Sequence, residues 1–222
     1  KSMKSSFPAG ASVIVVDLRQ ESHGFVNGSP VTWVAGYDWA NLGKSPAEVN
    51  QRETQQLGQL KPGEEFELPP AKGDDQGGSP VKCVTRSISS EAELLATLGL
   101  GYKRFYVPDH FRPDDAQTDD FVHFVDQLPP DTWLHFHCRG GKGRTTTFMV
   151  MYDSLHKADR VTLEHILKRQ AVLEPHYQLT DVRPTSPNHK VYEDRYEFVK
   201  AFYAYSRARK KGFKGLWSDW LQ

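Results

Sequence analysis

The segment WLHFHCRGGKGRTTTFMVMYD, residues 133–153, contains a strand, a glycine-rich loop and a helix in direct succession. The strand is expected to end at His137, and the helix is expected to begin right after Arg144. The first turn of a helix carries backbone N–H groups without partners and the positive end of the helix dipole, and both attract anions. Gly140, Gly141 and Gly143 allow the loop to curl so that successive amides face one phosphate. The segment therefore predicts a phosphate-binding loop.

Two side chains of this loop add chemistry to the predicted phosphate site. Arg144 can bind two phosphate oxygens through its planar guanidinium group. Cys138 lies where the loop amides and the helix dipole would stabilise a thiolate, which is the nucleophilic form of cysteine. The loop is not a Walker A motif, because Lys142 is followed by Gly143, and it does not match the Gly-x-Gly-x-x-Gly pattern of dinucleotide-binding folds. We therefore expect a cysteine nucleophile placed against a bound phosphorus.

The remainder of the chain alternates predicted strands with predicted helices. Residues 12–18 are rich in β-branched side chains, and the Asn27-Gly28 pair is typical of a hairpin turn. The expected strands are residues 12–18, 31–34, 81–85, 103–107 and 132–137. The expected helices are residues 46–60, 90–99, 118–128, 145–156, 162–172 and 188–210, and residues 69–80 are expected to form a connector. This alternation indicates an α/β fold.

The composition is that of an ordinary globular protein. The chain has 222 residues, 38% of them hydrophobic, and its 28 basic and 28 acidic side chains give a formal charge of zero with neutral histidines. Such a length suits one domain with a substantial core. Zero net charge argues against a general nucleic-acid partner, and no apolar run is long enough for stable membrane insertion. Residues 1–6 lack the apolar core of a signal peptide, so both a cytoplasmic location and export with a signal absent from this chain stay open.

The cysteine and histidine patterns bear on redox and metal chemistry. Two cysteines cannot form a disulfide framework, and Cys83 lies in a predicted strand without a glycine loop, so we expect it to be a structural thiol. The sequence has no HExxH or CxxC motif and no acidic cluster with metal-ligand spacing. We therefore expect no metal and no other cofactor.

The loop HCRGGKGRTT, residues 137–146, resembles the signature loop of the protein-tyrosine-phosphatase superfamily. More closely, the chain resembles the bacterial protein-tyrosine-phosphatase-like phytases, also called cysteine phytases or myo-inositol polyphosphate phosphatases. The other matching segments are DLRQESHGFVNG (17–28), DWANLGKS (38–45), VPDHFRP (107–113) and WSDWL (217–221). The resemblance covers nearly the whole chain and implies a phosphatase-like central mixed sheet flanked by helices. It implies a single domain over residues 1–222, with at most a small β elaboration within residues 26–85.

The resemblance also implies roles for four residues. Cys138 would be the nucleophile that forms a phosphocysteine intermediate, and Arg144 would bind the transferring phosphoryl group together with the amides of residues 139–144. Asp109 would protonate the leaving oxygen and then act as the base that activates water. Thr145 would hydrogen-bond near the sulfur of Cys138 and assist the second step.

Positive charge in the loop indicates the class of substrate. Arg139 and Lys142 add two cations beside Arg144, which suits a substrate that carries several phosphates. His110 and Arg19 lie in segments that reach the substrate in the family. The alternative roles are structural ion pairing for Arg19 and a solvated loop histidine for His110. For Lys190 and Arg195 on the last long helix, the alternative is a solvated helix face. The predicted substrate-binding residues are Arg19, His110, Arg139, Gly140, Gly141, Lys142, Gly143, Lys190 and Arg195.

The sequence thus leads to one principal hypothesis and two alternatives. The principal hypothesis is a metal-independent cysteine phosphatase that hydrolyses phosphomonoesters of myo-inositol polyphosphates such as phytate. Its partner would be a small polyphosphorylated molecule, and the sequence predicts no particular oligomeric state. One alternative is a tyrosine or dual-specificity phosphatase that acts on phosphoproteins. The other is a catalytically weak module that binds inositol phosphates.

Overall fold

A central parallel sheet organises the molecule. The computed structural model describes residues 7, 8, 10–68, 81–173 and 176–222, so the expected connector at 69–80 lies outside the described residues. The sheet has the order β7-β1-β8, with β7 at Gly101–Arg104, β1 at Val13–Asp17 and β8 at Trp133–His137. Both neighbours run parallel to β1, and Asp17 is in register with Arg104 on one side and His137 on the other. The loops that follow the three strands therefore meet at one edge of the sheet, where α/β folds bind ligands.

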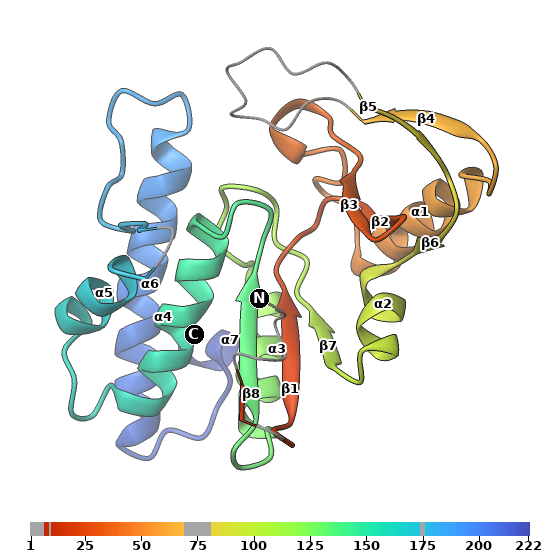
Figure 1. Cartoon of the computed structure of the whole chain (residues 1–222). Coiled ribbons are helices and arrows are strands. Elements are labelled where there is room, and N and C mark those ends of the chain that lie inside the picture. The colour runs from red at the N-terminus through yellow and green to blue at the C-terminus, as the bar shows by residue number, and fades with distance from the viewer. Residues whose placement is uncertain (1–6, 9, 69–80, 174–175) are drawn as a thin grey trace.

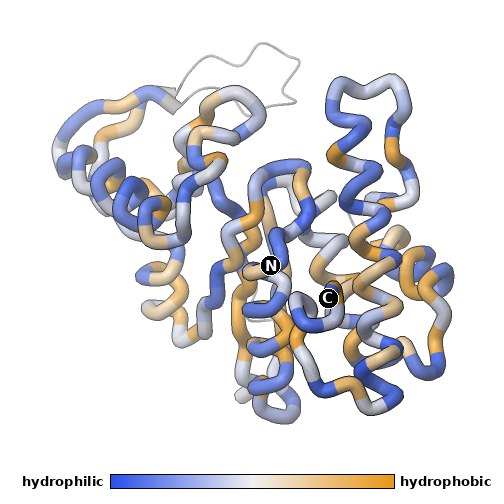
Figure 2. The backbone as a smooth tube through the Cα atoms, turned by 180° about the vertical axis from the view of Figure 1, so that it is seen from behind, coloured by the Kyte–Doolittle hydropathy of each residue, from blue (hydrophilic) through white to orange (hydrophobic). Residues whose placement is uncertain are grey.

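Helices and an aromatic core surround this sheet. The helices that follow the central strands are α3 (Asp115–Asp126), α4 (Gly143–Lys157), α5 (Leu163–Ala171), α6 (His189–Lys210) and α7 (Trp217–Trp220). Figure 1 shows α4, α5 and α6 together on one side of the molecule. The rings of Phe105, Phe121 and Phe148 lie 4.9–5.5 Å apart and are fully buried between sheet and helices. Hydrophobic segments are concentrated in these central strands and helices (Figure 2), which is the burial that stabilises the fold.

Two small antiparallel sheets lie on the other side of the central sheet (Figure 1). One has the order β3-β2-β6, formed by Ser29–Thr32, His23–Val26 and Ile88–Ser89, and the other pairs β4 (Glu65–Leu68) with β5 (Val81–Val84). The helices α1 (Pro46–Gln59) and α2 (Glu91–Thr97) and a short turn, η2 (Gly36–Asp38), accompany them. Asn27 and Gly28 have φ values of 54° and 76°, as the expected hairpin turn between β2 and β3 requires.

The α/β class and the phosphatase-like architecture expected from the sequence are confirmed. Parallel and antiparallel pairing are both present, but they are segregated: the described central sheet is parallel, and the antiparallel pairs lie in the two small sheets. Whether residues 1–222 form one domain with these sheets as its elaboration stays a prediction.

Several element boundaries differ from those expected. The helix predicted from residue 118 begins at Asp115, because the Asp114 side chain accepts a hydrogen bond from the Gln117 amide at 2.7 Å and caps it. The strand predicted at 103–107 is observed at Gly101–Arg104, and the return strand predicted at 31–34 is observed at Ser29–Thr32. The very short strands β4 and β6 and the last helix, α7, had no clear sequence signal.

Candidate active site

The loop of residues 138–142 connects β8 to α4 at the ligand-binding edge of the sheet, and we call it the catalytic loop. Cys138 follows β8 directly and is only 9% exposed. The Thr145 hydroxyl donates a hydrogen bond to the Cys138 sulfur at 3.3 Å, a contact that the family resemblance implied. The side chain of Lys142, the N-cap residue of α4, makes no capping hydrogen bond, so it leaves the backbone amides of the first turn available to an anion. The sulfur thus lies beside the amides expected to bind a phosphate.

The Arg144 guanidinium is fully buried and fixed by a carboxylate that sequence reasoning missed. Its Nη1 and Nη2 donate to the two oxygens of Glu21 at 2.6 and 2.8 Å, and Nη1 also donates to the Val107 carbonyl at 3.0 Å. Burial disfavours the charged guanidinium, but the Glu21 carboxylate outweighs it and raises the pKa of Arg144. The Nε atom is buried without a hydrogen-bond partner in the described part of the chain. This atom is therefore available to a phosphoryl oxygen.

Asp109 lies in the loop of residues 107–113, which we call the acid loop. Its Oδ1 forms an ion pair with Arg144 Nη2 at 3.0 Å, and its Oδ2 lies 3.3 Å from His110 Nε2. The Asp109 side chain is 26% exposed, so it is open to the cleft as an acid or base must be. Burial lowers the pKa of His110, which favours the neutral imidazole.

A cluster of arginine and tyrosine side chains lies against the acid loop. Arg195 is buried, donates to the His110 carbonyl at 3.1 Å, and lies over the rings of Tyr177 and Tyr192 at 5.4 and 5.3 Å. A Cβ at Gly143 would collide with the guanidinium of Arg195, so a side chain there would displace Arg195 from the first turn of α4. Arg183, which sequence reasoning missed, stacks on the same two rings at 5.7 and 5.4 Å. The predicted Arg195 thus lies beside the catalytic loop.

These groups share one large cleft of about 1300 Å³. It is lined by most of the predicted site residues, namely Arg19, Asp109, His110, Cys138, Arg139, Gly140, Lys142, Gly143, Arg144 and Arg195. Gly141 has a positive φ of 64° inside the catalytic loop and does not line the cleft. Lys190 is exposed near the start of α6 and is also absent from the lining. The fold therefore brings together all of the predicted cations except Lys190.

Arg139 was expected to add an uncompensated positive charge to the loop, but in the structure this charge is paired. Its guanidinium forms an ion pair with Asp38, a buried residue of η2 that lies 101 positions earlier in the chain. Lys142, by contrast, is exposed at the mouth of the cleft. The two loop cations therefore present different net charges to a substrate.

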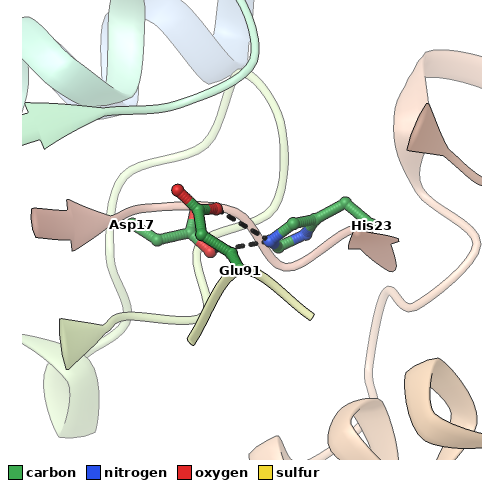
Figure 3. Close-up of side chains that lie close together, drawn as sticks. All are labelled: Asp17, His23 and Glu91. Atoms are coloured by element: carbon green, nitrogen blue, oxygen red, sulfur yellow. Dashed lines mark ion pairs between the residues drawn. The ribbon is translucent and has the colours of Figure 1, made fainter. Parts of the chain in front are cut away.

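A buried ionic network supports the loop after β1. Arg19 Nε contacts Asp17 Oδ1 at 2.8 Å and Arg19 Nη2 pairs with Glu91, so Arg19 takes part in structural ion pairs while also lining the cleft. Figure 3 shows His23 directed toward the carboxylates of Asp17 and Glu91, with distances of 3.0 and 3.4 Å from its Nε2. Burial opposes a charged imidazole, but the hydrogen bonds to Asp17 and Glu91 prevail and raise the pKa of His23 to about 9.

Asp17, His23 and Glu91 have the donor atoms of a metal site, because one atom of each lies within 4.8 Å of the others. The carboxylates are already bound to cations and donors, however. Asp17 contacts Arg19, accepts from the Tyr102 hydroxyl at 2.9 Å, and lies 3.5 Å from Arg104. Glu91 pairs with Arg19 and lies 2.9 Å from His137 Nε2. This donor set fits an ionic network rather than a divalent ion.

Cys83, expected to be a structural thiol, is partly buried in β5, and both cysteines are free. Asp153 of α4 accepts hydrogen bonds from Lys157 in the same helix and from Arg169 and Gln170 of α5. The latter two bonds join α4 to α5. Among the helices of the described residues, none has the length and apolar character needed to cross a membrane.

The chain is similar in sequence to one protein family and to proteins of Pseudomonas and Xanthomonas. Residues 72–155 match the family model for PTP-like phytases, whose description names inositol hexakisphosphate. The effector protein hopD2 of Pseudomonas syringae pv. tomato is 34% identical over 225 residues, and the match covers 99% of this chain but only 48% of that protein. The uncharacterized protein AvrBs1.1 of Xanthomonas campestris is 36% identical over 97 residues, which are 43% of this chain and 93% of that protein. The chain thus spans about half the length of the first of these relatives.

Two solved structures closely match the fold. A PTP-like phytase from Bdellovibrio bacteriovorus has a TM-score of 0.83 and 37% identity, and the match covers 98% of this chain and 80% of that one. The PTP-like myo-inositol phosphatase from Mitsuokella multacida, in complex with myo-inositol-(1,3,4,5)-tetrakisphosphate, has a TM-score of 0.89 and 35% identity. That match covers 98% of this chain and 37% of the Mitsuokella chain.

Protonation of His23 should make the stability of the fold depend on pH. Because its pKa is raised from 6.5 to about 9, the folded state binds this proton more tightly than the unfolded state. The resulting stabilisation is complete below pH 6.5 and is lost as the pH rises through about 9. In urea unfolding, the midpoint of the wild type should therefore fall further over this range than that of His23→Gln. Parallel falls in both proteins would rule out His23 as the titrating group.

Proposed function

The chain belongs to the PTP-like phytase family, and from this premise we propose that it is a metal-independent cysteine phosphatase that hydrolyses phosphomonoesters of myo-inositol polyphosphates. One observation carries the proposal: a buried, carboxylate-fixed arginine and an uncapped helix N-terminus lie beside a cysteine at the edge of a parallel sheet. Such an arrangement stabilises the charge of a transferring phosphoryl group without an added ion.

The first step transfers the phosphoryl group to Cys138. The thiolate attacks phosphorus, the S–P bond forms, and the P–O bond to the inositol ring breaks. The catalytic-loop amides and Arg144 bind the three non-bridging oxygens. Asp109 donates its proton to the departing oxygen, since an inositol alkoxide is a poor leaving group. A bound phosphoryl group would also replace Asp109 as the partner of Arg144.

The second step returns the enzyme to its starting state. Asp109, now a carboxylate, removes a proton from water, the water oxygen attacks phosphorus, and the S–P bond breaks to release inorganic phosphate. The departing sulfur becomes a thiolate again. The Thr145 hydroxyl, which is 3.3 Å from that sulfur, stabilises the charge that develops there.

The cations of the cleft support a substrate with several phosphates. Lys142, Arg183 and Arg195 line the same cleft as Cys138, although the chain has no net charge. Arg183, which pairs with Asp181 at 3.4 Å, and the buried Arg195 add positive charge to this cleft. While one phosphate occupies the catalytic loop, the exposed Lys142 is available to phosphates that are not being transferred. An inositol ring carries such phosphates on neighbouring carbons.

A phosphotyrosine substrate is the second candidate, and one observation favours it. The lining of the cleft also includes the apolar side chains of Val31, Trp33, Val34, Leu60 and Phe66, all of them at least partly exposed. Such an apolar surface suits an aromatic ring more than an inositol polyphosphate.

Initial rates on inositol hexakisphosphate, a phosphotyrosine peptide and a phosphoserine peptide separate the candidates. An outright preference for the peptides would overturn the inositol assignment. Intact Cys138, Asp109 and Arg144 argue against a module that only binds.

Replacement of the nucleophile should separate binding from turnover. Cys138→Ser should release no phosphate from inositol hexakisphosphate, because the hydroxyl is a far weaker nucleophile than the thiolate. It should still bind this compound in calorimetry, because the loop amides and Arg144 are unchanged. Sustained turnover by Cys138→Ser would contradict the phosphocysteine mechanism.

Replacement of the acid should depend on the leaving group. Asp109→Asn should slow hydrolysis of inositol hexakisphosphate by about 10²–10⁴-fold, which is the usual contribution of a general acid. Hydrolysis of p-nitrophenyl phosphate should fall much less, because its leaving group needs little protonation. Equal losses of kcat on the two substrates would assign Asp109 a structural role instead.

The exposed loop cation should act on additional phosphates. Lys142→Gln should lower kcat/KM on inositol hexakisphosphate by about tenfold, the effect of about 1.4 kcal/mol, and lower it much less on an inositol monophosphate. Added salt should weaken the wild-type preference in the same direction by screening. The matched control is Lys168→Gln on α5, where the lysine is 71% exposed and pairs with Glu164. Equal effects on both substrates would refute a role for Lys142 in substrate selection.

A further inference from the structure

Residues 36–41 follow strand β3 and carry a turn with an unfavourable backbone. Tyr37 and Asp38 have φ values of 58° and 64°, which non-glycine residues rarely adopt. Two consecutive residues of this kind persist only where their surroundings hold them. Asp38 is also buried, although it carries a charge. Contacts with the rest of the molecule must therefore hold this segment in its strained conformation.

One set of contacts joins the segment to the acid loop. Trp39 Nε1 donates a hydrogen bond to the backbone carbonyl of Asp109 at 2.8 Å. The Trp39 ring also packs edge-on against Phe111, with centroids 5.5 Å apart. Tyr37 lies 4.9 Å from the Trp39 ring and 6.0 Å from the His110 ring. Three successive residues of the acid loop thus contact this segment.

Other contacts reach the two remaining loops of the site. Asp38 forms its ion pair with Arg139 of the catalytic loop. Asn41 Nδ2 donates to the Gln20 carbonyl at 3.0 Å and lies 3.1 Å from the Ser22 hydroxyl. Gln20 and Ser22 flank Glu21, the residue that fixes Arg144. Residues 36–41 therefore touch the catalytic loop, the acid loop and the loop after β1.

We propose that Trp39 is a positioning residue for the acid step, and that residues 36–41 hold the acid loop against the catalytic loop. This inference rests on the proposed function. In the empty site, Arg144 and His110 contact the Asp109 carboxyl. A bound phosphoryl group would take Arg144 from it. The hydrogen bond from Trp39 to the Asp109 backbone does not involve the carboxyl, so it persists and keeps the acid directed at the leaving oxygen.

The test removes one N–H group and leaves the aromatic packing. Trp39→Phe should lower kcat on phenyl phosphate, whose leaving group needs a proton, by about tenfold, and lower kcat on p-nitrophenyl phosphate by less than about twofold. In the Asp109→Asn background, Trp39→Phe should cause no further loss on either substrate. Equal losses on the two substrates, or independent losses in the double variant, would overturn the proposal.

A second measurement needs no turnover. Amide hydrogen exchange over residues 107–113 should be faster in Trp39→Phe than in the wild type, whereas exchange in the central strands should be unchanged. Unchanged exchange in the acid loop would overturn the positioning role. The matched control is Trp133→Phe at the opposite end of β8, where the ring is 45% exposed. It should leave the ratio of the two kcat values as in the wild type.

This pair of aryl phosphates separates the two proposals. The inositol assignment would be refuted if the wild type hydrolysed both aryl phosphates but not inositol hexakisphosphate. In that case the ratio of kcat on phenyl phosphate to kcat on p-nitrophenyl phosphate in Trp39→Phe would still decide the role of Trp39. Turnover of inositol hexakisphosphate with an unchanged ratio in Trp39→Phe would refute the positioning role alone.

Discussion

The bidentate ion pair between Glu21 and Arg144 is the interaction on which the site depends. Both side chains are fully buried, and neither charge could be buried without the other. The pair joins the loop after β1 to the first turn of α4, so it fixes the guanidinium relative to the sulfur of Cys138. With its terminal nitrogens occupied, the group has little freedom to turn. An anion that binds the catalytic loop therefore meets a preorganised partner.

The loop that carries Glu21 depends in turn on the elements outside the central sheet. Arg104 donates to the Glu21 carbonyl at 3.1 Å and to Glu53 of α1 at 2.9 Å. The Glu53 carboxylate also accepts from the His23 amide at 2.8 Å. The β3-β2-β6 sheet and α1 are thus connected to Arg144 through buried polar contacts. Elements outside the central sheet therefore help to position the residues of the candidate site.

The arginines of the cleft differ in how far a neighbouring group compensates their positive charge. Asp38 compensates Arg139, Asp17 and Glu91 compensate Arg19, and tyrosine rings cover Arg195. The charge of a guanidinium that stacks on an aromatic face is not offset by an anion, whereas a guanidinium paired with a carboxylate contributes little net charge to the cleft. The affinity of the cleft for anions therefore depends on whether each arginine contacts a carboxylate or an aromatic ring. A count of basic residues in the sequence is insufficient to predict it.

The sequence by itself determined what depends on neighbouring residues. The glycine-rich turn with Cys138 and Arg144 and the hairpin at Asn27-Gly28 are set by steric preferences over a few neighbouring positions, so the sequence was sufficient to predict them. Tertiary structure alone decided the partners. Glu21 lies 123 residues from Arg144, Asp38 lies 101 from Arg139, and Trp39 lies 70 from Asp109. Ion pairing and hydrogen bonding depend on distance in space, and the register of the central sheet and the path of its loops set that distance.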